Sequence, residues 1–414
     1  MRNNLRLIAL TWVIFICSLI LQNSDSLRLS QAQEIAKSHL YSTIQWELDN
    51  FFDKWIHKIK TFATSSSLTP KEQTDLISQY FSLVDREALL RNQISVTNNN
   101  TDPLKDKSLT ELRSELSNIS TKRLEIRDQV EEILEAAIQD AVDKEGLIWG
   151  APLRALGIKM PPVDFRLEPA PMVLVVSPRE RIEMIEGFLL RPGITLSDIE
   201  EIENMATEVK DLSILAEQTG GVATYPSIVP PDRTLNSTLI TATHEWLHHY
   251  LFFHPLGRNY WGDHDTRSLN ETLANIFSQE LGSMLSKKYT QTNNRISFPS
   301  KQPTIDFRPE MQIVRKETDR LLADGNIIEA ELYMEQKRQF LEAHGINIRK
   351  INQAYFAFHG TYADSSASIS PIFDQLTSLR ASSHSLGDFV HKVAKCSNYE
   401  NFQKMLSLPT GTAC

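Results

Sequence analysis

The distribution of apolar residues divides the chain into helical stretches at both ends and an irregular stretch between them. An apolar run, Leu7 to Leu21, is followed from Leu29 to about Thr61 by apolar residues at three- and four-residue steps, which predict an amphipathic helix. The same spacing predicts one helix over Lys71–Val84 or somewhat beyond, and another from about Leu104 to Asp143. We therefore expect the region 29–145 to be a helical hairpin or short coiled coil.

The predicted helix from Leu104 carries many Glu, Lys and Arg residues between its apolar positions. Mixed charges along a helix are typical of a face that is exposed to solvent. We therefore expect these charged side chains to be solvated rather than to form a ligand site.

Proline and glycine become frequent after Gly146, where the composition of the chain changes. Short apolar runs at Val163–Leu167 and Met172–Val176 predict strands, and a helix is expected near Leu196–Lys210. Residues Gly220 to Pro226 predict a bend into an edge strand that ends at the proline. Such a strand could hold a peptide by β-addition, or it could be an ordinary core strand.

The rest of the chain again has a helical pattern. Four helices are expected, from a start at Asp232–Thr234 or Ser237 to His254, from Ser268 to about Leu285, near Pro309–Leu322 and near Ile327–His344. The first of them must end by His254, because Pro255 disfavours helix at the residue before it. Residues 146–414 are therefore expected to form one predominantly helical catalytic domain with a small sheet, and the whole chain an α+β fold.

The N-terminus has the features of a targeting segment. Arg2 and Arg6 precede the apolar run, which matches a secretory signal in length and is short for a membrane span. No small-residue cleavage site follows Leu21, so we expect residues 1–28 to be an uncleaved signal anchor. The body would face the extracytoplasmic side, since the positive charges precede the segment. Cleavage would instead release a secreted protein.

Composition and charge exclude one class of function. Of the 414 residues, 41% are apolar, which is ordinary for a globular protein. The formal charge of −9, without a long run of Lys or Arg, gives no electrostatic basis for binding nucleic acid. Of the three cysteines, Cys17 lies in the apolar run. Cys396 and Cys414 could form one disulfide in an oxidising compartment or remain free thiols.

One stretch, Thr243-His244-Glu245-Trp246-Leu247-His248-His249-Tyr250, contains the pattern H-E-x-x-H. Positions i and i+4 of a helix share a face, so His244 and His248 can offer both imidazoles to one metal ion while Glu245 lies beside them. This spacing is typical of zinc hydrolases, in which the glutamate is the general base. The alternative is an amphipathic helix with two surface histidines.

A catalytic zinc site needs a third protein ligand and an open position for water. His254 has the distance from His244 that the pattern H-E-x-x-H-x-x-G-x-x-H requires. Leu251, however, stands where that pattern has the glycine that allows a sharp turn. Glu271 is the other candidate. It could also be part of a capping box, with its carboxylate reaching back to the backbone of Ser268.

The two motifs together resemble the gluzincin metallopeptidases, in which H-E-x-x-H is followed on a second helix by an N-E-x-x-A-like segment. Here that segment is Asn270-Glu271-Thr272-Leu273-Ala274. The resemblance implies a Zn²⁺ ion bound by His244, His248 and Glu271. It also implies that Glu245 is the base. Gluzincins often carry Asp four residues after the ligand Glu, as an acceptor for a ligand His, and this chain has Asn275 there.

The resemblance covers about Gly220 to Lys395 and is weakest near its end. Residues 351–362 look like the C-terminal helices of predicted bacterial aminopeptidase-like gluzincins. Hydrolysis needs a donor aimed at the developing oxyanion, and Tyr355, His359 or Tyr362 could supply it. Of these, Tyr355 and His359 are taken as the candidate catalytic residues.

These expectations combine into a zinc metallopeptidase that hydrolyses a peptide bond outside the cytoplasm, with a metal-activated water and Glu245 as general base. The substrate would be a peptide or protein, and the N-terminal anchor would contact the membrane. One alternative is a membrane-tethered, non-catalytic binding or scaffold protein on a gluzincin-like frame. Another, among enzymes, is a metzincin-type site that uses His254.

Overall fold

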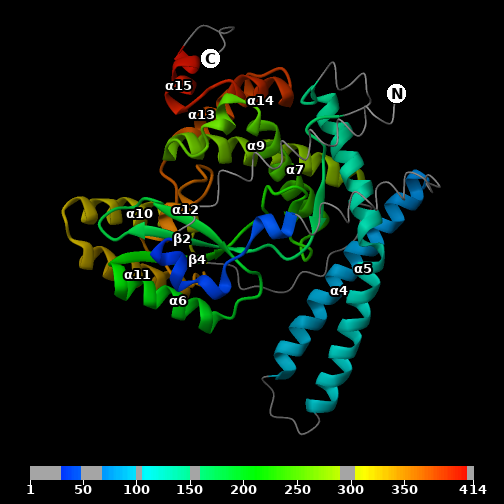
Figure 1. Cartoon of the computed structure of the whole chain (residues 1–414), viewed down its shortest axis with the longest axis horizontal. Helices are drawn as coiled ribbons and strands as arrows, with labels where there is room; N and C mark the ends of the chain where they lie inside the picture. Colours follow the sequence, from blue (N-terminus) through cyan, green and yellow to red (C-terminus); the bar gives the residue numbers. More distant parts are fainter. Residues whose placement is uncertain (1–28, 48–67, 99–104, 150–158, 290–303, 408–414) are drawn as a thin grey trace.

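The computed structural model describes residues 29–47, 68–98, 105–149, 159–289 and 304–407 (Figure 1). These residues are predominantly helical and include a two-stranded and a three-stranded sheet, in agreement with the expected α+β class. The expected signal anchor, 1–28, lies outside the described residues. None of the helices in the described part combines the length and the apolarity that crossing a membrane requires.

Helices α4 (Pro70–Asn98) and α5 (Lys105–Lys144) pack along each other as a hairpin, whose far end projects from the rest of the molecule (Figure 1). Both helices were predicted from their periodicity. Their buried apolar residues include Ile77, Tyr80, Val84, Val130, Leu134 and Ile138. These residues continue into the main hydrophobic core, so the near end of the hairpin is part of the body.

The near end of α5 is fastened to strand β1 (Phe165–Leu167), and to the residue two positions before that strand, by side chains that accept backbone N–H groups. The three pairs are Glu131 with Leu167 at 2.7 Å, Glu135 with Phe165 at 3.0 Å, and Gln139 with Val163 at 2.9 Å. Four residues of helix rise about 6 Å, and two residues of strand advance about 6.6 Å. The helix therefore matches the spacing of the strand and satisfies its outer amides.

The charged residues of α5 are consequently not all solvated, which corrects the expectation from the sequence. Glu131 is fully buried at 0% exposure and Glu135 at 5%. Arg123, 8% exposed, donates to Glu87 of α4 at 2.7 Å and to Tyr80 at 3.0 Å. Backbone amides and an opposite charge replace the water that these groups lose on burial.

The single amphipathic helix expected from Leu29 to about Thr61 is wrong for the described residues up to 47. A short helix α2 (Gln31–Ile35) and a 3₁₀ turn η1 (Lys37–His39) are followed by Leu40, which pairs with Leu190 of strand β3 (Glu186–Leu190). Packing of this segment against a sheet overrides its helical periodicity. Residues 48–67 lie outside the described part.

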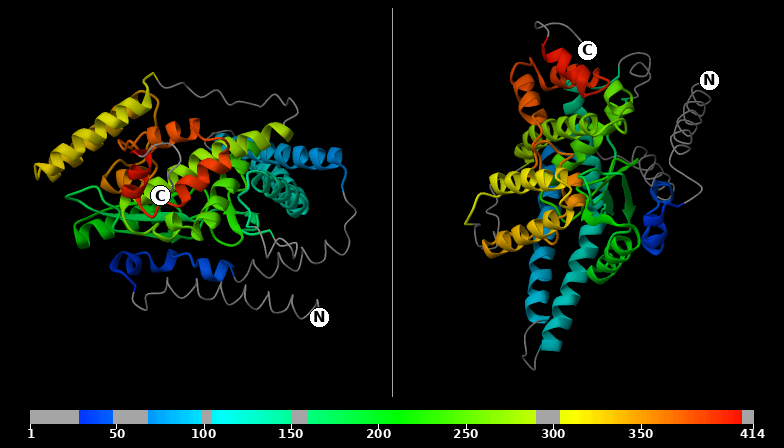
Figure 2. Two further views of the ribbon diagram at one scale, coloured as in Figure 1. Left: turned by 90° about the horizontal axis from the view of Figure 1, so that it is seen from above. Right: turned by 90° about the vertical axis from the view of Figure 1, so that its left-hand side faces the viewer.

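The three-stranded sheet has the order β3-β2-β4 and is antiparallel throughout, with β2 (Met172–Pro178) between β3 and β4 (Leu212–Gln218). One face packs against α2 and α6 (Leu196–Lys210), and the other face against three helices (Figures 1 and 2). These helices are α10 (Phe307–Ala323), α11 (Ile327–Ala343) and α12 (Gln353–His359). The predicted strands at 163–167 and 172–176 and the predicted helices at 196–210, 309–322 and 327–344 are confirmed in position.

The edge strand expected over Gly220–Pro226 is wrong. Val222 forms only an isolated bridge to Ile228, and strand β5 (Ser227–Val229) begins after the proline and runs parallel to β1. The outer edge of β4 is covered as well, because Asn352 donates to the carbonyl of Ile214 and Arg349 to that of Ala216. This part of β4 therefore offers no free edge for an added strand.

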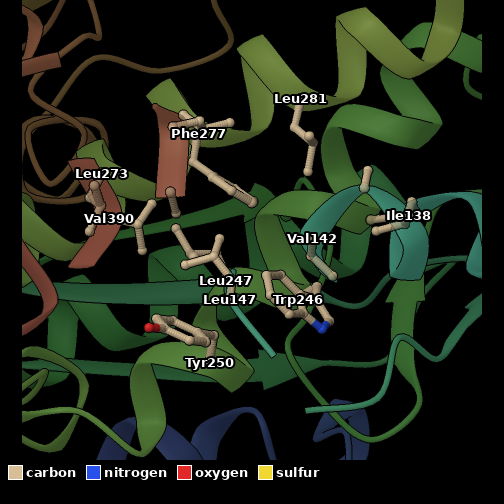
Figure 3. Close-up of a cluster of buried hydrophobic side chains, with 14 of the residues drawn as sticks. Ile138, Val142, Leu147, Trp246, Leu247, Tyr250, Leu273, Phe277, Leu281 and Val390 are labelled. Atoms are coloured by element: carbon tan, nitrogen blue, oxygen red, sulfur yellow. The ribbon is translucent and has the colours of Figure 1, made fainter. Parts of the chain in front are cut away.

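Helices α7 (Leu235–Phe252) and α9 (His264–Tyr289) cross at the centre of the main core and are joined through the short α8 (Pro255–Arg258). Trp246 of α7 stacks with Phe277 of α9, and Ile138 and Val142 of α5 and Val390 from the C-terminal part of the chain belong to the same cluster (Figure 3). Three C-terminal helices cover α9, namely α13 (Ile372–Ala381), α14 (Leu386–Ala394) and α15 (Tyr399–Ser407).

Cys396 follows α14 and is buried and disulfide-bonded. The expected partner Cys414 lies outside the described residues.

The fastening of α5 to β1 predicts a loss of stability when its acceptors are removed. Glu135→Ala removes the carboxylate that accepts the amide of Phe165 and is expected to lower the free energy of unfolding by about 1–3 kcal/mol, measured by urea denaturation. Glu135→Gln keeps an acceptor and should cost less. Glu125→Ala, at an exposed position of the same helix, should change the value by less than about 0.5 kcal/mol. Equal effects at positions 125 and 135 would contradict this account.

Candidate metal centre

Helix α7 has the boundaries that its sequence predicts. The side chain of Thr234 accepts the amide of Ser237 at the start, and the helix ends at Phe252, ahead of Pro255. Its apolar side lies in the core. His244 and His248 lie on the other side, with 13% and 16% of their side-chain surfaces exposed. The two imidazoles are therefore close to the surface but held by a well-packed helix.

Helix α9 begins at His264, four residues before the expected Ser268. Asp263 caps it by accepting the amide and the hydroxyl of Thr266, at 2.8 and 2.7 Å. Ser268 is thus inside the helix, and the capping-box alternative for Glu271 is wrong. Glu271 is instead 4% exposed and lies on the side of α9 that faces α7.

His244, His248 and Glu271 bring three ligand atoms together. The two Nε2 atoms lie 3.0 Å apart, and Glu271 Oε2 lies 3.4 Å from that of His244 and 3.6 Å from that of His248. Ligands at 2.0–2.1 Å around a tetrahedral zinc ion would lie about 3.3 Å from one another. Glu271 Oε2 is buried without a hydrogen-bond partner. A bound cation would coordinate this oxygen and so compensate for the missing hydrogen bond. The three residues therefore fit a metal ion.

The electrostatics of this group are those of a buried carboxylate against imidazoles. Burial alone would raise the pKa of Glu271, but the charge of His248, with that of His244, holds it well below its usual range. Burial likewise opposes the charged form of His248, and Glu271 overcomes it and raises the pKa of His248 to about 9. In Glu245, burial is the largest influence and raises the pKa above its ordinary value. The two glutamates thus differ in proton affinity.

Two further residues orient the ligands. Asn270 Oδ1 lies 3.1 Å from Nδ1 of His248, and Tyr260 donates a short hydrogen bond to Oε1 of Glu271. A partner on the far ring nitrogen fixes the tautomer of a metal-binding histidine. The sequence assigned this task to Asn275, but the amide of Asn275 donates to Asp364 instead. Neither Asn270 nor Tyr260 was predicted in such a role.

Gly221 makes room for the carboxylate of Glu245. A Cβ atom on Gly221 would lie 2.6 Å from Oε1 of Glu245 and 2.7 Å from the side chain of Thr241. Any larger residue would therefore force a shift of Glu245, of Thr241 or of Gly221 itself. The double glycine at 220–221 was visible in the sequence, but it was interpreted as a bend before a strand.

The candidate oxyanion donors separate into two groups. Tyr355 and His359 contact each other, with ring centres 4.3 Å apart, and His359 Nε2 lies 4.0 Å from Glu217. Tyr362 instead interacts with Glu271 and Glu245, and burial together with these charges raises the pKa of its phenol well above 10. Tyr362 therefore keeps its proton at neutral pH and is the candidate placed beside the metal ligands.

His254 does not join the three ligand residues. Its Nδ1 donates to the carbonyl of Tyr250 at 2.8 Å, and its ring stacks on that of Tyr250 at 4.2 Å. Leu251 is helical and fully buried, so the chain continues straight where a glycine turn would be needed.

Comparisons of the chain with protein-family models, with curated proteins and with solved structures find no match.

The geometry predicts which substitutions remove the metal. The full-length protein is expected to bind about one zinc ion per chain, and His248→Ala and Glu271→Ala are expected to lose it, because each removes one of three ligands. His254→Ala should retain it. Atomic absorption on the purified proteins measures the content. Retention in Glu271→Ala together with loss in His254→Ala would instead favour the metzincin-type site.

Proposed function

We propose that the protein is a gluzincin-type zinc peptidase that hydrolyses peptide bonds. The observation that carries the proposal is the convergence of His244, His248 and Glu271 on one point, with Glu245 beside them. The clearance that Gly221 leaves for the Glu245 carboxylate supports a catalytic use of that group. The N-terminal segment 1–28 favours action outside the cytoplasm, at a membrane or after secretion.

In this proposal His244, His248 and Glu271 hold the zinc ion, and Asn270 and Tyr260 keep two of these ligands in place. The ion supplies Lewis acidity and makes water more acidic. Glu245 accepts the proton from the attacking water and then delivers it to the leaving amine. The raised pKa of Glu245 suits both steps, since a base with a pKa closer to neutrality can also act as the acid.

Tyr362 is proposed as the donor to the developing oxyanion. Its phenol is protonated and lies near both Glu245 and Glu271, where the carbonyl of a bound peptide would be attacked. A donor already in position stabilises negative charge that appears only in the transition state. Tyr355 and His359 pack beside Glu217, and this contact gives them no comparable role.

Replacing the base tests the reaction without removing the metal. Glu245→Gln is expected to abolish turnover of a fluorogenic peptide library while its zinc content equals that of the wild type, because Gln cannot accept the proton. Zinc content and melting temperature of the same preparation are the controls. If the wild type binds zinc but cleaves no peptide, the alternative of a non-catalytic binding or scaffold protein is favoured. Full activity of Glu245→Gln would show that the proposed mechanism is wrong.

The two tyrosines distinguish the candidate donors. Tyr362→Phe is expected to lower kcat by about 100- to 1,000-fold with little change in KM, as loss of one oxyanion donor does. Tyr355→Phe removes an equivalent hydroxyl from the residue beside Glu217 and should leave kcat nearly unchanged. Steady-state kinetics on one cleaved peptide compare the variants. The opposite order would assign the role to Tyr355.

A further inference from the structure

Arg267 lies at the edge of the metal centre, one helical turn before Glu271 on α9. Its guanidinium carbon is 4.8 Å from the ring centre of Trp261 and 5.7 Å from that of Tyr260. Tyr260 also donates to Glu271, so one tyrosine contacts both the metal ligand and the arginine. A guanidinium stacked on aromatic rings has its planar set of donors fixed in orientation.

The charge of Arg267 has no anionic partner in the part of the chain that the structure describes. Within the described residues, no ion pair or hydrogen bond engages its guanidinium, and its Nε is buried without an acceptor. The two acids one turn away on the helix are both occupied. Asp263 caps α9 through Thr266, and Glu271 faces the imidazoles and Tyr260. Arg267 is therefore a cation whose fork of donors remains available.

The position of Arg267 is also electrostatically unfavourable. It stands in the first turn of α9, where the helix macrodipole favours negative rather than positive charge. A buried donor without an acceptor adds to this cost. A bound anion would relieve both, and bidentate recognition of a carboxylate is the interaction that a guanidinium makes best.

We infer that Arg267 binds a carboxylate of the substrate close to the scissile bond, which rests on the proposed peptidase and adds its substrate class. Arg267 and Glu271 are separated by about 6 Å of helix rise, and an extended peptide advances about 3.3 Å per residue. The carboxylate therefore belongs within one or two residues of the bond that is cut. Trp261, 75% exposed, provides a surface for the adjoining residue. Two groups of a peptide could supply the carboxylate that Arg267 binds: its C-terminal carboxylate or an acidic side chain.

Binding to a protein that cannot cleave the peptide tests the inference. Calorimetry on full-length, zinc-treated Glu245→Gln protein compares three probes, namely acetyl-trialanine as the free acid, its C-terminal amide, and acetyl-Ala-Glu-Ala amide. We expect the free acid to bind about 10- to 100-fold more tightly than its amide, since one charge-assisted pair is lost. Tight binding of acetyl-Ala-Glu-Ala amide would show that an acidic side chain can also supply the carboxylate.

Changes at Arg267 should remove this preference in the same background. Arg267→Gln is expected to bind free acid and amide within about twofold of each other, with an unchanged zinc content. Arg267→Lys keeps the charge but not the planar fork and should retain only part of the preference. Arg258→Gln, an exposed arginine on the neighbouring α8, is the matched control and should behave as the parent protein.

Three results would overturn the inference: equal affinity of the parent for all three probes, no detectable binding of any probe, or an undiminished preference in Arg267→Gln. Failure of the peptidase proposal gives a different result. A wild-type protein that cleaves none of the peptides, but binds the free acid in an Arg267-dependent manner, would retain the carboxylate site and lose the hydrolysis.

Discussion

The close packing of α7 against α9 is the constraint on which the metal centre depends. A Cβ atom at Gly282 of α9 would lie 2.7 Å from the backbone of Ile240 of α7, so only glycine allows this approach. The histidines belong to α7 and Glu271 to α9, and no local sequence spacing fixes the distance between two helices. The stack of Trp246 on Phe277 is a further contact between the same two helices. Together these contacts hold Glu271 Oε2 within 3.4 and 3.6 Å of the imidazoles.

The hairpin supports this crossing and is not an independent module. Gln139 of α5 holds the backbone of Val163, and two residues earlier the carbonyl of Pro161 accepts from Trp246 Nε1 at 3.2 Å. Hydrogen bonds thus connect α5 to the buried side of α7 through one short segment. Glu131 and Glu135 extend the same connection along β1. Tilting of the hairpin would therefore disturb the helix that carries His244 and His248.

Features that depend on residue spacing within one helix could be predicted from the sequence. Contacts between segments that are far apart in the chain could not. Helix periodicity placed α7 and, within four residues, α9. The i, i+4 spacing selected His244 and His248, whereas Glu271 was chosen from the resemblance to gluzincins, and the three converge. The long helix expected from Leu29 failed because Leu40 pairs with a strand far along the chain. The family analogy pointed to Asn275, whereas it is Asn270 that lies against Nδ1 of His248. The double glycine at 220–221 was visible in the sequence, but the need for glycine at 221 is explained by its close approach to Glu245, which only the tertiary structure shows.

The charges around the centre form a consistent set once a divalent ion is included. Two neutral imidazoles and the Glu271 carboxylate leave one positive charge on a bound zinc ion, which ionised Glu245 balances. Asn270 lies against His248 without adding a negative charge, so in the proposed enzyme less of the charge of the ion would be neutralised and a carbonyl would be polarised more strongly. Among the described residues, Arg267 then remains without a compensating charge at the edge of the site. In the proposed peptidase, a substrate with a carboxylate there would complete the balance, whereas a neutral peptide would leave it incomplete.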